Sequence, residues 1–190
     1  MKRFFSSIAL ALVAALALTG CGSSDSSGSG AADFNEADVT FAQSMIPHHE
    51  QAVQMAKMAK MHASTPEVKN LADKIESAQG PEIKTMKGWL KDWGKSESSG
   101  SMGGMDHGSG SDMDMPGMMS GDEIAGLNKA TGATFDKMFL TMMIAHHTGA
   151  IEMAKTEQSK GKNADAKALA KTIEAAQTTE IAEMKKMLIP

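Results

Sequence analysis

Two regions of the chain carry apolar residues at the spacing of amphipathic helices, and the same pattern occurs in both. In the first region the shared positions are 38, 41, 45, 48, 52 and 55, and these steps of three and four place them on one helical face. The second region repeats them at a fixed offset of 98 residues, with no gap between positions 38 and 90. Such a repeat predicts two copies of one structural unit.

Each unit is predicted to be a helical hairpin. The second helix of the first unit is expected to begin at Thr65, a residue that can cap a helix, with Pro66 at the first helical position. Its counterpart is expected to begin around Asn163. Ser120 and Glu123 have the spacing of a capping box, which predicts a short additional helix before the second unit.

The predicted fold is all-α, because two hairpins can bury the apolar faces that one hairpin leaves exposed. We expect an antiparallel four-helix bundle formed by tandem hairpins at residues 34–94 and 120–190. The stretch 95–119 is rich in Gly, Ser and Met without apolar periodicity, so we expect a disordered, flexible loop there. Pro47 and Pro81 fall inside predicted helices and are expected to bend or break them.

The N-terminal segment is typical of an exported lipoprotein. Residues 1–20 combine a basic start with an apolar run too short to span a bilayer, as in a signal peptide. They end in Leu-Thr-Gly before Cys21, an arrangement that resembles a lipoprotein box with Cys21 as the acylated residue. Residues 21–33 are then a flexible tether, and the protein is expected to be extracytoplasmic and anchored to a bacterial membrane. The alternative is an ordinary signal peptide that leaves a free thiol.

Composition argues against a nucleic-acid partner. Without Lys2 and Arg3 the chain has 17 basic and 23 acidic side chains, and it contains no further Arg. Binding to nucleic acid depends on neutralising phosphates, which this balance does not favour. The unusual residue is methionine, with 18 copies against no Tyr, two Trp and six Phe.

Each half contains a Met followed three and four residues later by two adjacent histidines. On a helix both rings then lie one turn from the thioether, and the rings diverge by about 100°, so that one can face the core and the other a groove. Imidazole nitrogen beside thioether sulfur favours copper over Mg, Ca or Mn; Cu(I) is preferred, with Cu(II) and Ag(I) as alternatives. Hydrogen-bonded structural histidines are the competing interpretation. The candidate ligands in the bundle are His48, His49, His146, His147, Met45, Met143, Met55 and Met153.

Met55 and Met153 are also explained as core residues, because methionine fills irregular gaps in apolar interiors.

Polar residues recur at equivalent positions of the two partner helices. One role would be to accept the second ring N–H of a ligating histidine and so fix its tautomer. The alternative is a solvated flank of an amphipathic helix. These candidate partners are Glu76, Gln79, Glu82, Glu174, Gln177 and Glu180.

The central stretch places six thioethers and one imidazole within residues 102–119. A polar segment gains nothing from exposing so many Met side chains, whereas soft ligands on a flexible chain can wrap Cu(I) or Ag(I). Low-complexity drift and an oxidisable sink are the alternatives. The candidate ligands are Met102, Met105, His107, Met113, Met115, Met118 and Met119.

The segment Phe135–Ala154, with its Met-Ile-x-His-His centre, resembles the DUF305 family. The resemblance covers about residues 34–189 apart from the central loop. It implies an exported, ferritin-like helical protein, and some members of the family are periplasmic copper-binding proteins involved in copper tolerance.

The predicted function is an extracytoplasmic copper-binding protein that buffers, sequesters or transfers copper, with a copper-transfer protein as a candidate partner. A ferritin-like redox enzyme is the first alternative. The chain lacks the Glu-x-x-His pair that holds iron in such bundles, and it offers no nucleophile with a base, so we expect no enzymatic activity. The second alternative is an envelope interaction module with structural histidines. Oligomeric state is left open.

Overall fold

The computed structural model describes residues 33–98 and 115–189, and within these ranges every regular element is a helix. The predicted signal peptide, most of the predicted tether with Cys21, and the candidate ligands Met102, Met105, His107 and Met113 lie outside the described residues. The prediction of an all-α fold is confirmed. The helices are α1 (Glu36–His62), α2 (Pro66–Asp92), α3 (Gly121–Lys129), α4 (Gly132–Lys160) and α5 (Ala164–Met187).

Side-chain caps set the start of several helices. The Thr65 side chain accepts a hydrogen bond from the backbone N–H of Val68 at the start of α2, and Asn163 caps α5 in the same way. Ser120 and Glu123 form the predicted capping box of α3.

Neither internal proline breaks its helix. Pro47 lies inside α1 and Pro81 inside α2, and both helices continue through these positions. An internal proline costs about 3 kcal/mol through a lost hydrogen bond and a clash. Around Pro47 the burial of the apolar side chains of Met45 and Ile46 in the core offsets part of that cost.

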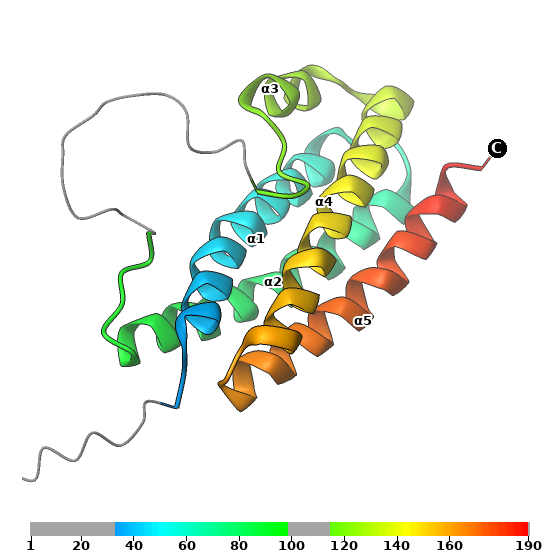
Figure 1. The fold of residues 1–190 in the computed structure, drawn as a ribbon. Coiled ribbons are helices and arrows are strands. Elements are labelled where there is room, and N and C mark those ends of the chain that lie inside the picture. The colour runs from blue at the N-terminus through cyan, green and yellow to red at the C-terminus, as the bar shows by residue number, and fades with distance from the viewer. Residues whose placement is uncertain (1–32, 99–114, 190) are drawn as a thin grey trace, which may run out of the picture. The chain divides into compact units, whose positions relative to one another are not determined.

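The two hairpins meet through their first helices. Helix α1 packs against α2, α4 packs against α5, and the main contact between the hairpins is the one between α1 and α4 (Figure 1). These two helices are antiparallel, because the Asn35 side chain at the start of α1 donates to the carbonyl of Lys160, the last residue of α4. Helix α3 contacts both, with Leu127 fully buried. The predicted bundle of two hairpins is present, and α3 is added to it.

Apolar residues form two separate clusters along the α1–α4 pair. One cluster contains the buried apolar side chains of α1 up to Ile46 and of α4 from Ala150 onward, together with Met86 of α2. The other contains α1 from Ala52 onward and α4 up to Met143. The residues between them on both helices are those of the paired histidines, so a polar layer divides the core.

Among the helices of residues 33–98 and 115–189, none combines the length and the apolar character that a membrane-spanning segment requires.

Candidate metal site

The four paired histidines form the polar layer at the middle of the bundle. His48, His49, His146 and His147 are each 0 % exposed. The divergence of neighbouring rings would allow one ring of each pair to face a groove, but none of the four is exposed. The central rings of α1 and α4 cover each other, and α2 and α5 lie against the outer rings.

His48 and His146 meet where α1 crosses α4. Their ring centroids are 3.7 Å apart and the ring planes are inclined by 35°. The two residues occupy equivalent positions in the repeat, so this contact joins the same position of the two halves.

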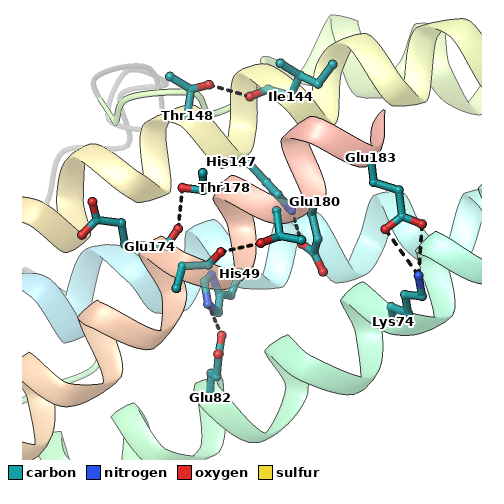
Figure 2. Close-up of polar contacts among 12 residues, drawn as sticks. His49, Lys74, Glu82, Ile144, His147, Thr148, Glu174, Thr178, Glu180 and Glu183 are labelled. Carbon is teal, nitrogen blue, oxygen red and sulfur yellow. Dashed lines mark hydrogen bonds and ion pairs between the residues drawn. The ribbon is translucent and has the colours of Figure 1, made fainter. Parts of the chain in front are cut away.

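His49 and His147 instead turn toward the partner helix of their own hairpin. The Nε2 atom of His49 is 2.7 Å from a carboxylate oxygen of Glu82 on α2. The Nε2 atom of His147 is 2.6 Å from a carboxylate oxygen of Glu180 on α5. Figure 2 shows both rings directed at these glutamates. The two carboxylates therefore lie where acceptors for a ring N–H are required.

The other four predicted partners do not contact the rings. Glu76 pairs with Lys60, and Glu174 accepts from the Gln158 side chain. Gln79 and Gln177 are buried, and neither is hydrogen-bonded to a histidine. Gln79 has no hydrogen-bond partner for either amide atom among the described residues.

Several ring nitrogens are buried without a hydrogen-bond partner within the described ranges. They are the Nδ1 atoms of all four histidines and the Nε2 atom of His146. A carboxylate accepts, so the Nε2 atoms of His49 and His147 donate, and in the neutral rings Nδ1 then carries the lone pair. Buried polar atoms without partners are costly and uncommon, and a lone pair in this position is suited to a metal ion.

Burial also favours neutral rings at the centre of the layer. It lowers the pKa of His48 to about 3, with the neighbouring His49 adding to the effect. Burial lowers the pKa of His146 well below its ordinary value, and the nearby His48 acts in the same direction. Because only the neutral imidazole can ligate a metal, these two rings are in the binding-competent form at neutral pH.

The candidate thioethers lie in different surroundings. Met45 and Met143 are fully buried and lie one helical turn from the rings. Met55 is also fully buried, in the apolar cluster that contains Leu127. Met153 is half-buried and lines a cavity of about 430 Å³ between α1 and α4.

Nitrogen and oxygen ligands alone do not complete a site here. Within residues 33–98 and 115–189, no three side chains of His, Cys, Asp or Glu are grouped so as to hold a metal ion. The thioethers of Met45 and Met143 lie one helical turn from the rings, and imidazole with thioether is a soft donor combination that suits Cu(I).

The end of the predicted flexible loop is held against this layer. In Met115–Met119, the backbone carbonyl of Pro116 lies 3.1 Å from His48 Nε2, and Met119 is bonded to the Gln51 side chain. The expectation of a flexible loop is therefore wrong for these residues, because α1 and α4 offer fixed partners for their backbone. Met115, Met118 and Met119 are half-buried. No feature of the sequence pattern identified the Pro116 carbonyl as a partner of His48.

Comparison with known proteins places this arrangement in a family. The family described as "Domain of unknown function (DUF305)" matches residues 38–188. Among curated proteins there is no match.

Solved structures of the same family are similar over most of their length. A DUF305 protein from Streptomyces coelicolor is 30 % identical, with a TM-score of 0.70, covering 80 % of this chain and 91 % of that one. A DUF305 fragment from Deinococcus radiodurans is 28 % identical, with a TM-score of 0.71, covering 81 % and 96 %. CopM in its Cu(I)-bound form is 32 % identical, with a TM-score of 0.62, covering 79 % and 94 %. CopM has also been solved in Cu(II)-bound, silver-bound and apo forms. This chain belongs to the DUF305 family.

Proposed function

We propose that the protein binds copper in the histidine layer between α1 and α4 and thereby buffers, sequesters or passes on the metal. The observation that carries this proposal is the set of fully buried histidines with ring nitrogens that have no hydrogen-bond partner in residues 33–98 and 115–189. Hydrogen bonds from His49 and His147 to Glu82 and Glu180 would orient these rings as they orient metal-bound histidines elsewhere.

The choice of metal rests on the donors and on a relative. Thioethers beside imidazoles favour Cu(I), and Cu(II) and Ag(I) are the next candidates. CopM, which shares this fold and about a third of its sequence, has been solved with Cu(I), with Cu(II) and with silver. Among these ions Cu(I) is proposed as the one that the site principally binds.

An enzymatic role is not part of the proposal. The carboxylates at the layer come from α2 and α5 and reach one histidine each, which differs from the Glu-x-x-His pairs that hold two irons in ferritin-like oxidases. Oxygen-dependent turnover of Cu(I) or of a phenolic substrate would support the redox enzyme instead. A role as an envelope interaction module would be supported by histidine variants that lose stability without any change in metal binding.

The site is proposed to act outside the cytoplasm, on a protein anchored through Cys21. The signal-like segment and the Cys-containing box support this location, and the Streptomyces coelicolor relative is described as a secreted protein. Sequestration would need only the metal, whereas transfer would need a copper-accepting protein partner.

An anaerobic competition titration with a Cu(I) chelator tests the proposal. The wild-type protein is expected to withdraw copper from the chelator, and replacing all four layer histidines with Gln is expected to abolish the tight sites. His62→Gln is the matched control, because His62 lies at the end of α1 beside Phe135 and outside the layer. Equal copper uptake by the wild type and the fourfold variant would rule the proposal out.

The contribution of the central stretch can be measured separately. Met102, Met105, His107 and Met113 can be replaced together, which leaves the ordered residues Met115–Met119 in place. We expect this variant to lose weaker sites while the tight sites remain.

A further inference from the structure

Residues Met115–Met119 form a strap across the histidine layer, and the strap supplies a contact that the bundle itself lacks. His49 and His147 each donate to a glutamate of their own hairpin. For His48 the corresponding group is the backbone carbonyl of Pro116, 3.1 Å from Nε2. A carbonyl can only accept, so Nε2 of His48 carries the proton and Nδ1 of the neutral ring carries the lone pair.

The fourth ring has no such partner. Within the described ranges no carboxylate or strap carbonyl bonds to either nitrogen of His146, and the backbone of His48 is the polar group that acts on its ring. The strap therefore makes the two central rings unequal although they occupy equivalent positions in the repeat. A property that distinguishes the halves must come from residues that differ between them.

The residues that hold the strap are not the same in the two halves. Gly149 of α4 and Gln51 of α1 are equivalent positions of the repeat, 98 residues apart. A Cβ atom at position 149 would overlap the Pro116 carbonyl, the same group that contacts His48. Only glycine leaves room for that carbonyl to approach.

Gln51 holds the other end of the strap. Its side-chain nitrogen donates to the Met119 carbonyl at 2.8 Å, and its side-chain oxygen accepts from the Met119 N–H at 2.8 Å. Between these two attachments Gly117 adopts a positive φ of 79°, and a Cβ there would come within 2.5 Å of the Ala145 carbonyl. The chain can follow this path only with glycine at the close approaches.

We infer that the strap is a positioning element of the metal site: Gly149 and Gln51 fix the Pro116 carbonyl, and that carbonyl orients the His48 ring and sets its tautomer. Backbone carbonyls perform this role for metal-bound histidines in general, and loss of such a partner typically lowers metal affinity about 10- to 100-fold. The inference rests on the proposed function, since it concerns the same rings.

The test combines ring spectroscopy with metal binding on the purified protein. In the metal-free wild type, ¹⁵N NMR of the imidazole nitrogens is expected to show His48 with its proton on Nε2. Gly149→Ala and Gln51→Ala are each expected to give mixed tautomers at His48 and an affinity for Ag(I) lowered about 10-fold. Gln51→Glu retains an acceptor for the Met119 N–H, and its effect is expected to be smaller.

Matched substitutions control for general destabilisation. Gly88→Ala places a Cβ in α2 where nothing lies within 4 Å, and Gln54→Ala changes an exposed glutamine three residues after Gln51. Both controls should leave the His48 tautomer and the Ag(I) affinity unchanged. A His48 spectrum that is unchanged in both Gly149→Ala and Gln51→Ala would overturn the inference, whatever the metal data show. A wild-type protein that binds neither Ag(I) nor Cu(I) would instead overturn the proposed function, and this positioning role with it.

Discussion

The ring of His48 on α1 lies against the ring of His146 on α4, with 3.7 Å between their centroids. Each ring belongs to a different hairpin, and the two hairpins are joined mainly through this pair of helices. A metal ion bound at the crossing would therefore be held by both halves of the protein. The repeat in the sequence does not by itself distinguish one shared site from two independent sites.

A shared site predicts that single substitutions at the crossing have similar effects. His48→Gln and His146→Gln should each lower Cu(I) affinity strongly, and the double variant should be only slightly worse than either one. Residues that act together in one site are not additive. Anaerobic chelator competition measures these affinities. Two independent sites would instead give single variants that lose half of the bound copper and keep the remainder at wild-type affinity.

The glutamates that contact the outer rings should affect metal binding without being ligands. Glu82→Gln and Glu180→Gln weaken the hydrogen bond that fixes each ring, and we expect affinity for Cu(I) to fall about 10-fold or more. Glu76→Gln is the control, since Glu76 pairs with Lys60 and not with a histidine. Equal affinities for Glu82→Gln and Glu76→Gln would contradict a positioning role for Glu82.

Thioether ligation can be separated from core packing by substitutions that conserve volume. Replacing Met45 and Met143 with Leu should change the free energy of unfolding by less than about 1.5 kcal/mol per site. Cu(I) affinity should nevertheless fall, because leucine has no donor atom. The control is the double change Met86→Leu and Met184→Leu, an equivalent pair of fully buried methionines on α2 and α5. The prediction fails if the two double variants bind Cu(I) equally well.

Two equivalent aspartates connect the hairpins at their ends. Asp38 of α1 accepts from the backbone of Lys162 and Asn163 in the α4–α5 turn. Asp136 of α4 accepts from Ser64 and Thr65 in the α1–α2 turn.

Removal of one of these aspartates should destabilise the fold. Asp136→Ala leaves the turn N–H groups of Ser64 and Thr65 without acceptors and is expected to cost about 2–3 kcal/mol. Denaturant unfolding measures this loss. Asp73→Ala, which removes only an exposed ion pair with Lys60, should cost less than about 1 kcal/mol.

A buried carboxyl beside Asp38 makes stability depend on pH. Burial raises the pKa of Glu157 to about 8, and the neighbouring Asp38 adds to the rise. Burial alone would raise the pKa of Asp38, but the neighbouring Glu157 carboxyl and hydrogen bonds from the backbone N–H groups of Asn35, Lys162 and Asn163 lower it overall. The folded protein thus retains the Glu157 proton over a range in which the unfolded chain has released it.

Stability from Glu157 should therefore fall as pH rises from about 4.5, the ordinary value of a glutamate, to about 8. Glu157→Gln keeps a neutral side chain at all pH values and should remove this part of the decline. Denaturant unfolding at several pH values, with Glu152→Gln as the exposed control, measures the difference. Parallel stability profiles for the wild type and Glu157→Gln would contradict the assignment.

The proposed lipid anchor has a direct test in cells. Cys21→Ser should move the protein from the membrane fraction to the soluble fraction, because the acylated thiol is lost. Cell fractionation with detection of the protein measures its distribution, and recovery of the wild-type protein in the soluble fraction would exclude anchoring through Cys21.

The sequence by itself determined the repeat, the helical hairpins and the paired histidines. These features depend on local spacing, which is written directly in the order of residues: periodicity predicted the helices, and Thr65, Ser120 and Asn163 marked helix starts. Equal positions in the repeat also indicated six candidate partners of the rings, of which Glu82 and Glu180 make the contact.

Tertiary structure alone decided which of these groups meet. The contact of His48 with His146 depends on the antiparallel crossing of α1 and α4, and helical periodicity does not encode the orientation of one hairpin against the other. The bond from His48 to the Pro116 carbonyl depends on a backbone path, which no side-chain pattern specifies. Burial of all four rings follows from packing on two sides at once, and this is the reason that spacing identified the histidines and a set of candidate partners, but neither which glutamates reach the rings nor the role of the Pro116 carbonyl.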